Sequence, residues 1–135
     1  MADNPTQNVN ENASTDDIQN DEAIVAEIHC MRKILNKLGR RDLQPTRANI
    51  RLVAEGVKRL VLKNVKLKVL SKSINTFSDL EALDLRNDQL SELPGDLNLP
   101  NLKVISLDNN KFTSYPSALK QHNKIEKIFL HDNQL

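Results

Sequence analysis

Residues 80–90 read LEALDLRNDQL, with leucines at the first, fourth, sixth and eleventh places of the stretch. An amphipathic helix repeats apolar residues at steps of three and four, and a half-buried strand alternates them. The spacing here fits neither pattern along its whole length. A short strand explains Leu83 and Leu85, because residues two apart lie on the same face of a strand. Leu80 and Leu90 then reach the same interior from the turns on either side.

Four copies of this pattern occur in phase. They are VKRLVLKNVKL from Val57, LEALDLRNDQL from Leu80, LKVISLDNNKF from Leu102 and IEKIFLHDNQL from Ile125, so that successive starts lie 23, 22 and 23 residues apart. A fixed period of this length with this consensus is typical of leucine-rich repeats. One coil cannot cover its own leucines, so we expect the four coils to stack and share a core that includes Leu83, Leu85, Ile105 and Leu107.

The chain is predicted to have three parts. Residues 1–15 are polar and are expected to be a disordered tail, residues 16–56 a helical hairpin that caps the first coil, and residues 57–135 the repeats. Gly39 suits the left-handed end of the first helix, and Pro45 opens the second, with Thr46 or Gln44 as its N-cap. Steps of four and three place five apolar residues on one face of the first helix: Ile24, Ile28, Met31, Leu35 and Leu38.

Residues 57–135 resemble leucine-rich-repeat proteins with LPxxL-like turns, such as Leu93 to Leu97 here. A helical hairpin before a short set of repeats is similar to secreted leucine-rich-repeat effectors of Gram-negative pathogens. It is also compatible with Ras-suppressor-like intracellular repeat proteins of 23-residue period. The resemblance implies an α/β solenoid of about four coils, with a parallel sheet on a concave side that binds another protein. It also implies an effector of virulence that inhibits or scaffolds its target in the host cytoplasm.

The ninth position of each copy is Asn in this family, because the amide can satisfy backbone groups of adjacent coils. The four residues here are Val65, Asp88, Asn110 and Asn133. We expect the hydrogen-bond ladder to be intact in the last two coils and acidic in the second. In the first coil we expect Val65 to pack against the hairpin instead.

Outward strand positions supply the candidate partner-binding residues. Positions 3, 5 and 7 contribute Arg59, Val61, Lys63, Asp84, Arg86, Ser106, Asp108, Lys127, Phe129 and His131. Phe129 is an aromatic residue beside charged residues, a composition typical of binding hot spots; packing on a neighbour near the open end is the alternative. Lys63 and Arg86 together suggest an acidic partner, with simple solubility as the alternative.

No catalytic, cofactor or metal site is expected. His29 and Cys30 are adjacent on a helix, so they point about 100° apart and cannot pair as nucleophile and base; Cys30 is expected in the core. Neither zinc-ligand spacing nor a glycine-rich phosphate loop occurs. With one cysteine, no signal-peptide pattern and no apolar run long enough to span a membrane, we expect a cytoplasmic chain, or one secreted into a host cell without a classical signal peptide.

The charges leave two alternatives to protein binding. Residues 40–72 carry ten Lys or Arg and two acids, whereas residues 1–30 carry seven acids and no Lys or Arg. We interpret the basic stretch as a solvated surface that balances the acidic N-terminus, since too few aromatic residues accompany it for a nucleic-acid binder. The other alternative is the substrate-recognition part of a longer enzyme. The fourth copy stops at Leu135, so we expect its open coil to be covered by a partner or a second copy, or the chain to be truncated.

Overall fold

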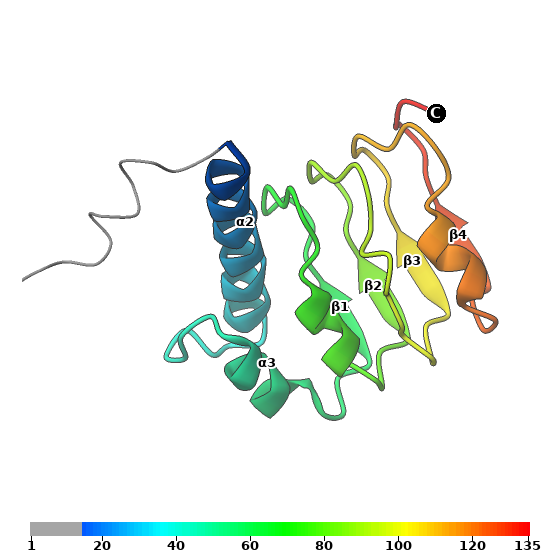
Figure 1. The fold of residues 1–135 in the computed structure, drawn as a ribbon. Helices are drawn as coiled ribbons and strands as arrows, with labels where there is room; N and C mark the ends of the chain where they lie inside the picture. Colours follow the sequence, from blue (N-terminus) through cyan, green and yellow to red (C-terminus); the bar gives the residue numbers. More distant parts are fainter. Residues whose placement is uncertain (1–14) are drawn as a thin grey trace, which may run out of the picture.

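Two helices stand at one end of a stack of four coils (Figure 1). The computed structural model describes the backbone of residues 15–135 and the side chains of residues 21–135, so the predicted tail falls outside the described residues except for Thr15. The helices are α2 (Thr15–Lys37) and α3 (Arg47–Ala54). Four strands follow, with 3₁₀ helices in the first and third coils: β1 (Arg59–Val61), η1 (Lys72–Thr76), β2 (Ala82–Asp84), β3 (Val104–Ser106), η2 (Ser117–Gln121) and β4 (Lys127–Phe129).

The strands form one parallel sheet in chain order, β1-β2-β3-β4. Each strand starts at the third position of its copy, so Leu60, Leu83, Ile105 and Ile128 are direct partners across the sheet. Leu83, Leu85, Ile105 and Leu107 are at most 1% exposed and belong to one core. The predicted leucine-rich-repeat solenoid is therefore confirmed.

A left-handed residue ends each strand turn. The eighth position of every copy has a φ between 58° and 61°, at Asn64, Asn87, Asn109 and Asp132. Asn and Asp tolerate this conformation better than other side chains, which explains why this column holds only these two types. These residues are exposed, and the positive φ of their backbone is enough to explain why Asn or Asp occupies each position.

The helical hairpin closes as its turn residues predict. Gly39, with a φ of 76°, follows the last turn of α2, and Gly56, with a φ of 78°, follows α3. Of the two N-caps considered for α3, Thr46 is the one used: its hydroxyl accepts a hydrogen bond from the backbone N–H of Asn49.

The buried face of α2 differs from the predicted one. Met31 and Leu35 are buried, but Ile24 and Ile28 are 55% and 42% exposed. Cys30 and Ile34, both 0% exposed, face the core instead. Figure 1 shows α3 beside the C-terminal half of α2 only, so the predicted stripe is covered there and bare nearer the N-terminus.

Hydrogen bonds to the first coil fix this orientation of α2. Ser71 Oγ donates to Glu27 Oε1 (2.7 Å), and His29 Nε2 donates to the Val65 carbonyl (2.9 Å). The backbone N–H of Ser71 also points at Cys30 Sγ (3.3 Å). Burial raises the pKa of the Cys30 thiol to about 12, so it stays protonated in the core. Val65, which was expected to pack against the hairpin, is half-buried against the core that α2 shares with the coils, and its carbonyl is the group that contacts α2 through His29.

The two faces of α2 give a paired stability prediction. Ile34→Ala removes a fully buried side chain and is expected to lower the free energy of unfolding by about 2–5 kcal/mol. Ile24→Ala, on the exposed continuation of the predicted stripe, is expected to change it by less than about 0.5 kcal/mol. Urea denaturation followed by circular dichroism measures both. A larger loss for Ile24→Ala would mean that α2 packs by its predicted face.

Candidate functional site

The outward side chains of the four strands form a single surface, which we call the sheet face. It consists of positions 3, 5 and 7 of each coil: Arg59, Val61, Lys63, Ala82, Asp84, Arg86, Val104, Ser106, Asp108, Lys127, Phe129 and His131. None of these residues is buried. All ten candidate residues lie here, and Ala82 and Val104 complete the rows. The rows run across the strands with a spacing of roughly 4.8 Å.

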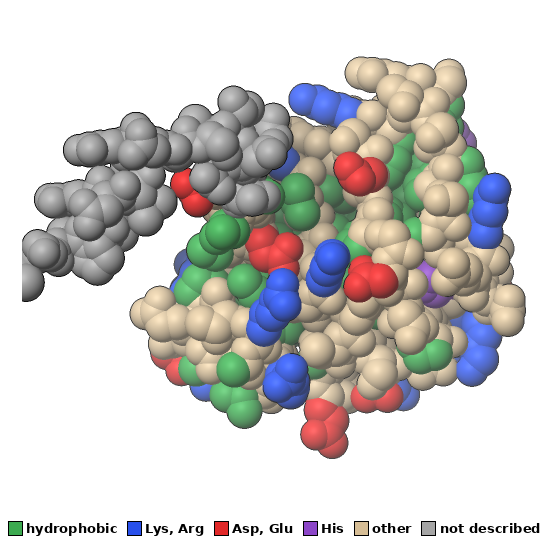
Figure 2. Space-filling model, in the orientation of Figure 1, with side chains coloured by type: hydrophobic (Ala, Val, Ile, Leu, Met, Phe, Trp, Pro, Cys, Tyr) green, Lys and Arg blue, Asp and Glu red, His purple; other side chains and the backbone are tan. Residues whose placement is uncertain are grey.

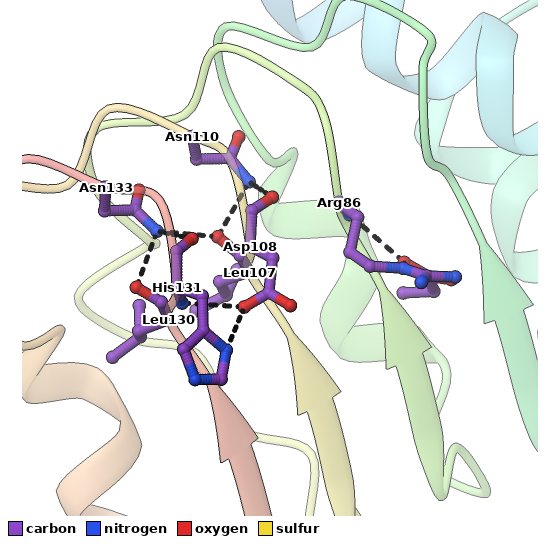
Figure 3. Close-up of polar contacts among 8 residues, drawn as sticks. Arg86, Leu107, Asp108, Asn110, Leu130, His131 and Asn133 are labelled. Atoms are coloured by element: carbon purple, nitrogen blue, oxygen red, sulfur yellow. Dashed lines mark hydrogen bonds and ion pairs between the residues drawn. The ribbon is translucent and has the colours of Figure 1, made fainter.

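Arg86 is held by its neighbour on the same coil. Its Nε and Nη2 donate to Asp84 Oδ1 (2.9 Å) and Oδ2 (2.8 Å), which is a bidentate pair (Figure 3 shows Arg86). Partial burial tends to raise the pKa of Asp84, but the hydrogen bonds and charge of Arg86, together with the charge of Lys63, outweigh it and lower the pKa. The sequence suggested Lys63 and Arg86 together as cations for an acidic partner. In the structure the charge of Arg86 is already compensated by Asp84.

A second polar pair lies on the third and fourth coils. The backbone N–H of His131 donates to Asp108 Oδ1 (2.7 Å), and the ring Nδ1 lies 3.4 Å from the same oxygen (Figure 3). The imidazole remains mostly exposed, with 78% of its side chain accessible. Asp108 thus ties the last turn to the sheet and leaves the His131 ring at the surface.

Phe129 is the aromatic residue of the sheet face. It is half-buried on β4, and its row neighbour on β3 is the small side chain of Ser106. The other two phenylalanines, Phe77 and Phe112, are in the core. Phe129 is therefore both partly supported by the sheet and partly open to solvent.

The asparagine ladder holds the turns behind the sheet face. Asn110 Oδ1 accepts from the Leu90 N–H (2.9 Å), while its Nδ2 donates to the carbonyls of Leu85 (2.9 Å) and Leu107 (3.1 Å). Asn133 repeats this arrangement one coil further, accepting from Phe112 and donating to Leu107 and Leu130 (Figure 3). The ladder predicted for the last two coils is confirmed.

Asp88 is the imperfect member of the ladder. Its Oδ1 accepts from the N–H groups of Val65 (3.0 Å) and Leu67 (3.1 Å). Its Oδ2 is buried and has no hydrogen-bond partner within the described part of the chain. Burial raises the pKa of Asp88, and the hydrogen bonds from Leu67 and Val65 offset only part of that rise. A carboxylate cannot donate to carbonyls as the amides of Asn110 and Asn133 do.

We expect Asp88→Asn to stabilise the protein by about 1–3 kcal/mol at neutral pH, because a buried unsatisfied acceptor becomes a donor. The folded-state pKa of Asp88 is raised, so its contribution to stability is fully present below the unfolded pKa of roughly 3.9 and is lost as pH rises through the folded value. The advantage of the variant is therefore expected to shrink in acid. Thermal unfolding between acid and neutral pH tests this, with the exposed Asp96→Asn as control. A variant less stable than the wild type at neutral pH contradicts it.

A groove that the sequence did not predict lies between α2 and the first coil. It encloses about 870 Å³ and is lined by Asp21, Glu22, Ala23, Val25, Ala26, His29, Lys66, Lys68 and Val69. Figure 2 shows hydrophobic side chains exposed on the side of the molecule where α2 and α3 lie. The exposed large hydrophobic residues of these two helices are Ile24, Val25, Ile28 and Leu52. The shape of the groove depends on the orientation of α2 against the first coil, which the spacing of apolar residues along the sequence does not predict. Residues 21–135 contain no group of three or more metal-ligand side chains.

Three relatives place the repeats among known proteins. The chain is 34% identical over 74 residues to Leucine-rich repeat and WD repeat-containing protein 1 of Xenopus laevis, a match that covers 55% of this chain and 10% of that protein. It is 36% identical over 61 residues to Asporin of Bos taurus, covering 44% and 16%. It is 31% identical over 91 residues to Ras guanine nucleotide exchange factor V of Dictyostelium discoideum, covering 56% and 5%.

The chain is thus weakly homologous to leucine-rich-repeat proteins, and it spans between 5% and 16% of the length of these relatives. No family model matches the chain. Among the described residues, no helix has the length and apolar character needed to cross a membrane.

Proposed function

We propose that this chain is a protein-binding module that engages its partner through the sheet face. One observation carries the proposal: the register that buries Leu60, Leu83 and Ile105 leaves every side chain of the sheet face accessible. The homology to leucine-rich-repeat proteins supports the same conclusion. The face presents open rows of side chains on neighbouring strands.

The sheet face suits binding because it is already organised. Each strand is held by its neighbours, and the turns of the last two coils are held by Asn110 and Asn133 of the ladder. Little side-chain and backbone conformational freedom therefore remains to be lost on association. The Asp84–Arg86 pair is fixed before any partner arrives. Phe129 offers a supported aromatic ring, the residue class in which binding energy is commonly concentrated.

The finer hypothesis is that the partner is a host protein and the chain a bacterial effector that inhibits or scaffolds it. The order of a helical hairpin followed by a few repeats supports this hypothesis. The relatives described above come from an amphibian, cattle and an amoeba, and their names carry no effector role. A role as the recognition part of a longer enzyme uses the same surface, and sheet-face variants would affect it in the same way.

Two substitutions test the sheet face directly. Phe129→Ala and Arg86→Glu are each expected to weaken partner binding about five- to thirty-fold, roughly 1–2 kcal/mol, without unfolding the protein. The partner is captured with the wild-type chain and identified by mass spectrometry, and its affinity for each folded variant is measured by titration calorimetry. Lys120→Glu, on η2 away from the strands, is the matched surface control. Affinities that stay at the wild-type value for both variants remove the sheet face from consideration.

Salt dependence separates protein binding from nucleic-acid binding. Neutralisation of several phosphates releases counterions, so a nucleic-acid complex loses about 10³–10⁵ in affinity between 50 and 200 mM salt when it makes 6–10 such contacts. A protein complex centred on Phe129 is expected to change by less than about tenfold over the same range, since apolar contact is not screened. A steep loss with salt, unaffected by Phe129→Ala, would favour the nucleic-acid alternative.

A further inference from the structure

The charges of the sheet face are unevenly compensated, and this indicates what kind of segment fits it. In the middle coils Asp84 pairs with Arg86 and Asp108 lies against His131. On the first coil, Arg59 and Lys63 are exposed and make no ion pair among the described residues. Residues 57–78 carry six Lys or Arg and no Asp or Glu. The first coil therefore carries two such cations of the face, against one, the exposed Lys127, on the fourth coil.

The opposite end of the face has a different chemistry. Phe129 lies half-buried on the fourth coil, in the same row as Val61 of the first coil. Ala82 and Val104, both partly exposed, give the middle of the third-position row an apolar floor. The face thus runs from two cations on the first coil, across a polar and apolar middle, to an aromatic ring beside one cation, Lys127, on the fourth.

The dimensions favour a short extended segment over a globular surface. Three strand spacings separate the first and fourth coils, which is roughly 14 Å at about 4.8 Å each, and positions 3 to 7 of one coil span roughly 13 Å at about 3.3 Å per residue. A standard protein interface buries roughly 800 Å² on each partner, far more than this patch offers. An extended chain advances about 3.3 Å per residue, so roughly four or five residues cross from the first coil to the fourth.

We propose that the sheet face binds an extended, acidic peptide segment of its partner, with acidic side chains at Arg59 and Lys63 and an apolar side chain, four or five residues away, against Phe129. This inference rests on the proposed function and adds the class of ligand and its spacing. The segment crosses the strands, so its two anchors contact the first and last coils at once. The direction in which the segment runs is left to experiment.

Synthetic nine-residue peptides provide the probe. The first peptide has two Glu near one end and a Leu-Phe pair centred four to five residues away, in a Ser/Thr background, and is made in both chain directions. The second has the same composition with Glu and Leu-Phe adjacent. The third replaces Glu by Lys. Each is titrated into the ¹⁵N-labelled full chain, and the amide shifts of the sheet face are followed.

We expect the first peptide, in one direction, to shift the amides of residues 59–63 and 127–131 together. It should bind at least fivefold more tightly than the adjacent-charge and Lys peptides. Lys63→Glu should weaken the first peptide at least fivefold and strengthen the Lys peptide, whereas the control Lys120→Glu should change neither. Equal affinities for all three peptides would overturn the inference. A 20-nucleotide single-stranded DNA that outcompetes the peptides at Lys63 would also overturn it.

The outcomes separate this inference from the proposed function. If the peptides shift the sheet face regardless of spacing, the ligand class is wrong and the surface stands. If no peptide shifts the sheet face but Phe129→Ala still weakens the captured partner, the inference again fails alone. If the peptides do not bind and both Phe129→Ala and Arg86→Glu leave the captured partner unaffected, both proposals fall. Self-association of the chain through the same amides, detected by sedimentation, would assign the face to a second copy.

Discussion

In-register stacking of the coils is the constraint on which the rest of the structure depends. Each coil's leucines are covered by the adjacent coils, and those of the first coil also by α2 and α3. The shared core therefore depends on Leu60, Leu83, Ile105 and Ile128 staying aligned. A slip of one residue in any strand would turn its inward side chains outward. The alignment that builds the core therefore also decides which side chains lie on the sheet face. A partner that binds across several strands depends on this register in all of them.

The core positions of the repeats could be predicted from the sequence, but the face by which α2 packs on the first coil could not. Leu83 and Leu85 could be assigned to the core because four copies share their spacing. Ile24 and Ile28 could not, because their helical spacing is real but the coverage of α2 is set by distant contacts to Ser71 and Val65. The Asp84–Arg86 pair carried a usable signal: opposite charges two residues apart on a strand share a face and can meet.

Segments of opposite charge in the sequence lie next to one another in the fold. The basic first coil lies between α2, which carries Asp21, Glu22 and Glu27, and a second coil in which residues 80–101 hold five acids and one base. Exposed pairs of this kind contribute little to stability. Their effect is on the potential of the sheet face, where Arg86 and, to a smaller extent, Lys63 lower the pKa of Asp84.

The cap and the ladder complement each other at the first coil. Val65 has no side-chain amide that could tie its turn to the neighbouring coil. Its backbone carbonyl instead accepts a hydrogen bond from His29 of α2, and its backbone N–H donates to Asp88 of the next coil. Asp88 Oδ1 receives two backbone donors, which a carboxylate accepts well, but the second oxygen is left buried and unpaired. The first coil is therefore held by hydrogen bonds both from α2 and from the second coil, so α2 packs on the first coil as a neighbouring coil would.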